Sequence, residues 1–139
     1  MKIYSYDSQK KTLLPLFQSA VAAGFPSPAE DYVEKKLDLN ELMVPHPTAT
    51  FFVKVEGSSM EDANIFSGDI LVVDRSLEAK NGAIVVAILN GEFTVKRLIK
   101  EKNKVFLCPE NNSFSKIEIG KEDSFEVWGV ISYIIHQAK

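Results

Sequence analysis

Cysteine is nearly absent from this chain. Cys108 is the only one, so no disulfide bond can form within the chain, and a reducing compartment, the cytoplasm, is expected. One cysteine and two histidines offer too few soft ligands for a structural zinc site, so we expect neither a metal nor a cofactor. No apolar run approaches the length of a bilayer span, and we therefore expect no membrane association.

Excess positive charge is also lacking. The 16 lysines and arginines stand against 19 aspartates and glutamates, which gives a net charge of −3. This balance argues against a direct electrostatic grip on nucleic acid, so no sequence-specific DNA binding is expected. The length of 139 residues and the hydrophobic fraction of 45% fit one globular domain with a short appendage.

A strand followed by a serine-containing turn is predicted over residues 51–60. Apolar and polar residues alternate as in a half-buried strand until Gly57 breaks the pattern. Ser58 and Glu61 then form the Ser-x-x-Glu signature of a helix start, which would place Ser59 in the first turn of a short helix.

The backbone N–H groups of Ser59 and Met60 would then lie where a helix leaves donors without partners. Such groups can stabilise a developing oxyanion, so Ser59 is a candidate nucleophile. On local pattern alone, a capped turn with two solvated serines explains the same residues, and a base elsewhere in the chain must decide between the two interpretations.

The chain from Thr50 onward reads as β structure. Asn90-Gly91 lies between two apolar runs, which is a strong hairpin signal, and Gly129 predicts a bulge or close approach within the last strand. The predicted strands after the first one cover residues 69–74, 83–89, 92–98, 105–107, 116–119 and 125–135.

The N-terminal part carries helical signals. Residues 1–11 are polar and read as a mobile arm. Ser27 to Glu30 combine a cap, a proline and a glutamate, which predicts a helix from there to about Lys36, and residues 39–43 suggest another turn. The sequence thus predicts a mainly β, compact domain with a short, partly helical N-terminal arm.

The candidate serine needs a base, which could be a histidine, a carboxylate or a lysine. A carboxylate base is possible, but nothing in the sequence places one. His136 lies near the C-terminus and His46 in a proline-rich loop, where each is most simply solvated. Lys96 follows the hairpin and leaves its strand beside Thr94 and Leu98, which are uncharged. By itself the position is more simply explained by an ordinary solvent-facing lysine, because lysine is seldom buried without a partner. A base would require the pKa to fall from about 10.4 by roughly three units through burial.

Residues 1–23 also admit interpretation as a secretory signal peptide, with small residues before a cut at Ala23-Gly24. Asp7 in the charged region and polar or proline residues in the apolar region argue against it. Ala23-Gly24 is nevertheless a small-small bond of the kind that a protease can accommodate.

Three separated motifs resemble the UmuD family, which belongs with LexA and the phage repressors that cut themselves. The resemblance runs from about Leu16 to near the C-terminus. Its motifs, in order, are Ala23–Ala29, Gly57–Met60 and Gly91–Arg97, and it includes residues 31–34 and the strand at 69–74.

The resemblance implies a LexA-like, β-rich peptidase domain at residues 24–139 and an arm at residues 1–23 that self-cleavage removes. It implies that Ser59 is the nucleophile and Lys96 the general base of a Ser-Lys dyad, and that the cut falls between Ala23 and Gly24. Two positions depart from the pattern: Ser58 stands where the family often has Asp, and Ala23 where some members have Cys.

The resemblance also implies partners. Cleavage would be stimulated by RecA filaments on single-stranded DNA during the SOS response. The shortened product would form a homodimer and join a UmuC-type polymerase of the Y family in error-prone translesion synthesis.

Other functions remain open at this point. A DNA-binding repressor would need a helix-turn-helix domain, for which residues 1–23 are too short, and a signal peptidase would need a membrane anchor. A β-rich dimeric interaction module with a silent dyad is one alternative. A small secreted β domain that a separate signal peptidase releases at Ala23-Gly24 is another.

Overall fold

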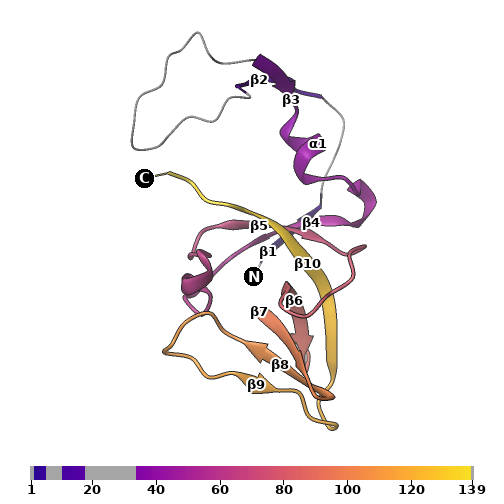
Figure 1. The fold of residues 1–139 in the computed structure, drawn as a ribbon, viewed down its shortest axis with the longest axis vertical. Coiled ribbons are helices and arrows are strands. Elements are labelled where there is room, and N and C mark those ends of the chain that lie inside the picture. The colour runs from indigo at the N-terminus through magenta and orange to yellow at the C-terminus, as the bar shows by residue number, and fades with distance from the viewer. Residues whose placement is uncertain (1, 6–10, 18–33, 139) are drawn as a thin grey trace. The chain divides into compact units, whose positions relative to one another are not determined.

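A computed structural model of the protein describes residues 2–5, 11–17 and 34–138, and these form a mainly β structure, as predicted (Figure 1). The chain divides into two compact units. One consists of Asp7–Pro45, and the other combines Met1–Tyr6 with His46–Lys139.

The larger unit is built on an antiparallel sheet. Within the described residues this sheet has eight strands in the order β1-β4-β5-β10-β6-β7-β8-β9. Two single-turn 3-10 helices, η2 (Pro47–Ala49) and η3 (Glu61–Ala63), flank β4 and its following turn. The strands are β1 (Lys2–Ser5), β4 (Thr50–Lys54), β5 (Ile70–Asp74), β6 (Ile84–Leu89), β7 (Glu92–Glu101), β8 (Lys104–Cys108), β9 (Ile117–Glu118) and β10 (Phe125–Ile135).

Two apolar clusters form the core of this unit. Because neighbouring residues of a strand point to opposite faces, β6 contributes Val86 to one cluster and Val85 to the other. Residues 71–74 of β5 are all buried, which confirms the prediction of a strand enclosed on both faces. The first cluster joins Val53, Val55, Met60, Ile65, Leu71, Val73 and Val86, and the second joins Val85, Ala87, Leu98, Leu107 and Val130.

The predicted hairpin at Asn90-Gly91 is confirmed. It joins β6 to β7 with Leu89 opposite Glu92, and both turn residues have positive φ values, 49° for Asn90 and 83° for Gly91. Two positive φ values define the tight turn that matches the twist of paired strands. The turn fixes the register of β7 and therefore the face on which each of its side chains emerges.

The irregularity predicted at Gly129 is also confirmed. The pairing of β10 with β6 shifts between Val127 and Gly129, as in a β-bulge. A Cβ atom at Gly129 would lie 2.5 Å from Val73 Cγ1, so only glycine allows β10 to approach β5 this closely.

The smaller unit differs from the sequence prediction. Glu34–Leu37 is strand β3, paired antiparallel with β2 (Leu14–Phe17), so the helix predicted to run to about Lys36 is wrong over these residues. Cross-strand pairing has overridden the helical pattern, which is a weak local preference. The predicted helix start at Ser27–Glu30 lies outside the described residues.

A short helix, α1 (Leu39–Met43), follows β3 where another turn was predicted. The Asp38 side chain accepts a hydrogen bond from the Asn40 N–H at 2.9 Å and so caps this helix.

The first residues of the chain correct a second prediction. Residues 1–11 were expected to form a mobile arm, but Lys2–Ser5 pairs with β4 as an edge strand of the large sheet. Sheet pairing uses backbone groups, so a polar segment without a clear period can still form a strand when a partner edge is available.

Candidate functional site

Ser59 lies in the turn that follows β4. Gly57 turns the chain with a φ of 96°, and the 3-10 helix η3 begins only at Glu61. The predicted helix cap at Ser58 is wrong: Met60 occupies the cap position without a side-chain hydrogen bond, and Ser58 instead accepts the Glu61 N–H through its backbone carbonyl at 3.3 Å. A single turn this short closes through backbone groups and does not use the Ser-x-x-Glu side chains.

Met60 anchors this turn in the core. Its side chain is 3% exposed and belongs to the first apolar cluster. Its carbonyl accepts the N–H groups of Ala63 at 3.1 Å and Ile65 at 3.2 Å. Ser59 is thus held at the surface by a neighbour that is fixed inside the molecule.

Lys96 comes from β7, opposite Val85 of β6. Its Nζ atom lies 3.1 Å from Ser59 Oγ, so the fold joins two side chains that are 37 residues apart. Nζ also donates to Thr94 Oγ1 at 2.8 Å and to the Val95 carbonyl at 3.0 Å. None of these three oxygen atoms belongs to a carboxylate.

Burial lowers the pKa of Lys96 below the ordinary lysine value of 10.5. The cause is desolvation, which disfavours the charged ammonium. The solvent-facing lysine that local sequence pattern allowed is therefore not what the structure contains.

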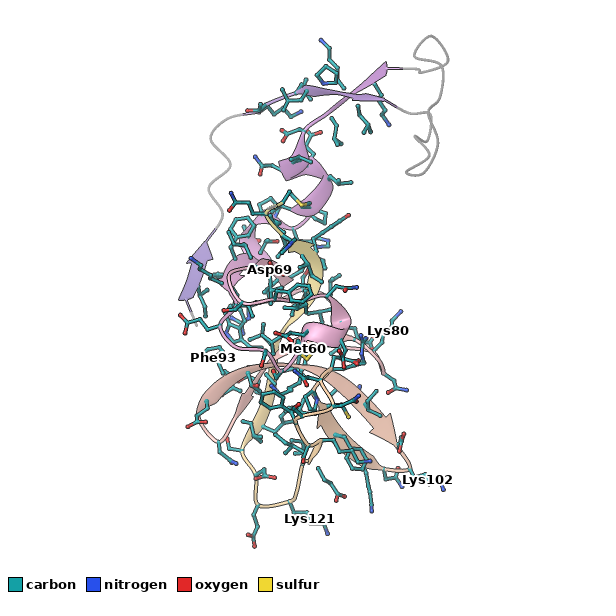
Figure 2. All side chains as sticks on the ribbon, turned by 90° about the vertical axis from the view of Figure 1, so that its left-hand side faces the viewer. Met60, Asp69, Lys80, Phe93, Lys102 and Lys121 are labelled. Carbon is teal, nitrogen blue, oxygen red and sulfur yellow. The ribbon has the colours of Figure 1, made fainter. Side chains whose placement is uncertain are left out.

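Ser59 and Lys96 both line a pocket of about 280 Å³. Phe93, which is 43% exposed, borders it from β7, and Met60 borders it from the turn; Figure 2 labels both. Among the described residues that line it, Glu56 is the one other charged side chain. The full lining is Val55, Glu56, Gly57, Ser59, Met60, Phe93, Thr94, Val95 and Lys96.

The two backbone donors predicted for an oxyanion site lie in the same turn. In the part of the chain that the structure describes, the N–H groups of Ser59 and Met60 do not donate to any backbone carbonyl. Both groups therefore remain candidates to bind a developing negative charge.

The two histidines are not simply solvated, which corrects the expectation from sequence. His46 Nδ1 lies 2.6 Å from Asp74 Oδ2, and His136 Nδ1 lies 2.6 Å from Asp69 Oδ1. Both aspartates are buried, at 2% and 3% exposure, while each histidine ring stays about half exposed. Neither histidine lines the pocket that contains Ser59.

Three further expectations concern the cleavage bond, metal binding and membrane association. Ala23 and Gly24 lie outside the described residues. In the described ranges, no three His, Cys, Asp or Glu side chains gather as a metal site would require. No helix there combines the length and apolar character needed to cross a bilayer.

Sequence reasoning missed the partners that surround these side chains. The alternation of β7 placed Thr94 beside Lys96 but gave no reason to expect a hydrogen bond. Asp69 and Asp74 looked like ordinary strand ends. Asn111, whose side chain reaches the Ser58 carbonyl at 2.7 Å, carried no signal, because its partner is 53 residues away.

Comparisons with known proteins identify the family to which this chain is similar. Residues 15–132 match the family described as Peptidase S24-like. Protein MucA of Salmonella typhimurium is 48% identical over 121 residues, which cover 86% of this chain and 82% of MucA. Protein SamA of Salmonella typhimurium strain LT2 is 42% identical over 125 residues, covering 90% of this chain and 86% of SamA.

The LexA repressor of Ectopseudomonas mendocina is 47% identical over 102 residues, which cover 73% of this chain but 50% of the repressor. The matches to MucA and SamA extend over most of both partners, and the family match spans most of the chain. The chain therefore belongs to the Peptidase S24-like family, as a UmuD-type member.

Proposed function

We propose that this protein is a self-cleaving serine peptidase in which Ser59 is the nucleophile and Lys96 the general base. The observation that carries the proposal is the 3.1 Å distance between Lys96 Nζ and Ser59 Oγ, at a lysine whose pKa burial lowers. A base within hydrogen-bond reach and able to be neutral near the working pH is what activation of a serine requires.

The three oxygen neighbours of Lys96 are compatible with either protonation state of its amine. An ammonium has three N–H groups, one for each of its three oxygen neighbours. A neutral amine has two N–H groups and one lone pair. The two N–H groups can stay with Thr94 Oγ1 and the Val95 carbonyl, which leaves the lone pair directed at the Ser59 hydroxyl.

The first half of the reaction forms an acyl-enzyme. Ser59 Oγ attacks the carbonyl carbon of the scissile bond while its proton passes to Lys96 Nζ. The N–H groups of Ser59 and Met60 stabilise the oxyanion. The bond to the leaving nitrogen then breaks, and Lys96 returns the proton to the new amino group.

The second half releases the product. A water molecule gives its proton to Lys96 and attacks the ester carbon, and Ser59 Oγ recovers a proton as the ester bond breaks. Both residues end as they began.

The scissile bond in this proposal is Ala23-Gly24. Cleavage there yields an arm of residues 1–23 and a β-rich domain of residues 24–139. Because the substrate is tethered to the enzyme, its effective concentration is high, and the rate depends on how often the arm reaches the pocket. An activator then needs only to favour the docked state.

The biological role that we propose rests on UmuD-type membership. RecA filaments on single-stranded DNA stimulate the cut in the cytoplasm during the SOS response. The shortened protein forms a homodimer and joins a UmuC-type polymerase in error-prone translesion synthesis. The similarity to MucA and SamA over most of their lengths supports this role better than that of a full-length repressor.

Mass spectrometry of the purified protein across a pH series tests the chemistry. The fragments Met1–Ala23 and Gly24–Lys139 should accumulate slowly without a partner. The rate should rise with pH as Lys96 loses its proton, and it should level off below the pH at which an ordinary lysine would titrate. A rate that is flat between neutral and alkaline pH, or a cut elsewhere, contradicts the assignment.

A comparison of two variants in cells tests the role. Full-length Ser59→Ala should fail to support mutagenesis after ultraviolet exposure, because its arm stays attached. A chain that begins at Gly24 and carries the same change should support it together with a UmuC-type polymerase. Equal activity of both variants would mean that arm removal is not the switch, and a silent dyad in a binding module would then fit better.

A further inference from the structure

The turn that presents Ser59 is not part of the sheet. The β4 strand ends at Lys54, and residues 57–60 have no strand partner in the described structure. Lys96, by contrast, is fixed on β7 between β6 and β8. The 3.1 Å contact between the two side chains therefore depends on whatever holds this turn against β7.

Asn111 contacts the turn on one side of Ser59. Its Nδ2 donates to the Ser58 carbonyl at 2.7 Å. The orientation of the amide is fixed at its other end, because Asn111 Oδ1 accepts the Ser113 N–H at 3.0 Å. Each end of this amide thus has one partner, so the side chain is set to donate to the turn.

Glu110 contacts the turn on the other side of Ser59. Its backbone carbonyl accepts the Asp62 N–H at 2.7 Å. Its carboxylate forms an ion pair with Arg97 Nε. Arg97 also donates from Nη1 to the Gly82 carbonyl at 2.6 Å, so the guanidinium joins Glu110 to the segment that leads into β6.

We propose that Glu110 and Asn111, held by Arg97, form a clamp that positions the Ser59 turn against Lys96 for self-cleavage. Arg97 is the chain neighbour of Lys96, and Ser58 is the chain neighbour of Ser59. The contacts therefore close a ring that runs from one member of the dyad to the other. This inference rests on the proposed function.

The ring matters because the turn that carries Ser59 would otherwise be poorly fixed, whereas Lys96 is already held on β7 with Thr94 and Val95 as partners. A turn outside the sheet has few bonds that resist displacement. Misplacing a catalytic group by about 1 Å can reduce a rate by up to roughly 100-fold. Loss of the clamp should therefore lower the rate of proton transfer and leave the acidity of Lys96 nearly as it is.

Asn111→Ala tests the clamp, with Asn112→Ala as the matched control. Asn112 is the exposed next residue of the same type. The measurement is the self-cleavage rate of the purified full-length protein over a pH series. We expect the plateau rate of Asn111→Ala to fall about 10-fold with an unchanged pH midpoint, while Asn112→Ala matches the unmodified chain.

Glu110→Gln provides a second variant. It removes the charge that pairs with Arg97 but keeps the backbone carbonyl that accepts from Asp62. We expect a smaller fall in the plateau rate, about 3-fold, again with the same midpoint. A plateau rate in both variants equal to that of the unmodified chain overturns the proposal, as does a fall that comes with a shifted midpoint.

Amide hydrogen exchange supplies a readout that does not need cleavage. In the Ser59→Ala background, Asn111→Ala should speed exchange at the Asp62 N–H about 10-fold or more, while exchange in β6 stays the same. Uniformly faster exchange would indicate general loss of stability and would overturn a specific clamp. If the unmodified protein does not cut itself, the proposed function fails, and Asp62 exchange still decides whether the clamp holds the turn.

Discussion

Three pairs of side chains in the larger unit bring polar atoms within hydrogen-bond distance of each other but differ in their surroundings. One pair is Ser59 and Lys96, and the other two join a histidine to an aspartate: His46–Asp74 and His136–Asp69. In the first pair the half-buried lysine nitrogen lies 2.8–3.1 Å from three uncharged oxygen atoms. In the other two, a half-exposed ring lies 2.6 Å from a buried carboxylate.

The difference shows how surroundings decide what a titratable pair can do. A lysine that is buried without an anionic partner has its pKa lowered and becomes available as a base. A buried carboxylate instead needs hydrogen bonds to keep its charge, and the histidine supplies one of them. We therefore expect the lysine pair to govern cleavage and the histidine pairs to govern stability.

The largest effect should come from Lys96→Arg. Guanidinium stays protonated at any usable pH and cannot accept the Ser59 proton. Self-cleavage should fall by about 100- to 10,000-fold in a mass-spectrometric time course, whereas Lys121→Arg, at an exposed turn, should cleave normally. Full activity of Lys96→Arg would point to a different base.

Thr94→Val should have the next largest effect on cleavage. Valine keeps the branched shape on β7 but removes the oxygen that accepts from Lys96 Nζ at 2.8 Å. With one of its two fixed partners gone, the amine should point at Ser59 less often, and the plateau rate should fall about 10-fold. Thr48→Val, at an exposed threonine, is the control. A rate in Thr94→Val equal to that of the control would mean that the threonine does not orient the lysine.

Asp74→Asn should act on stability alone. The Asp74 carboxylate accepts from Ser76 N at 2.8 Å and from Ser76 Oγ at 2.6 Å and lies beside His46. Replacing this buried acceptor with a poorer one should lower the free energy of unfolding by about 2 kcal/mol, measured by urea denaturation. Glu78→Gln, at an exposed side chain, should change it little. The folded variant should cleave at the rate of the unmodified chain, and a slower cut would tie this pair to catalysis.

The same carboxylate predicts a pH dependence. Burial raises the pKa of Asp74, but hydrogen bonds from Ser76 and His46 outweigh it, so the pKa lies below 3.8 in the folded protein. Its contribution to stability is therefore complete above the unfolded value and is lost as the pH falls through the folded one. Asp74→Asn should accordingly flatten the acid side of the stability profile.

His136→Gln should have the smallest effect. Its ring is half exposed, so the loss of its contact with Asp69 should cost about 1 kcal/mol or less in a thermal unfolding experiment. Cleavage should be unchanged. A strong loss of cleavage in this variant, with the fold intact, would support a histidine as the base. It would contradict the assignment of the histidine pairs to stability alone.

Much of the fold was predictable because its signals are local. The backbone preferences of Asn90-Gly91 are sufficient to predict a hairpin, and the short apolar run at residues 69–74 is sufficient to predict a buried strand. The predictions that failed depended on distant partners. Glu34–Leu37 became a strand because β2 lies beside it, and Lys2–Ser5 because β4 offers an edge.

The candidate site was predictable in part for the same reason. Gly57 and the serines after it indicate a turn from sequence alone, and the alternation of β7 put Thr94 on the side of Lys96. The contacts of Asn111 and Glu110 with that turn were not predictable, because neither residue carries a local signal for a partner about 50 positions away.

The sequence by itself determined the mainly β class, the hairpin that sets the register of β7, the bulge at Gly129 and the family to which the chain belongs. Only the tertiary structure decided that Lys96 reaches Ser59, that burial there lowers its pKa, and that each histidine meets a buried aspartate. Periodicity and turn preference act between neighbours in the chain. A pKa depends on burial and on the charges that folding brings near, and these are set only when distant segments pack together.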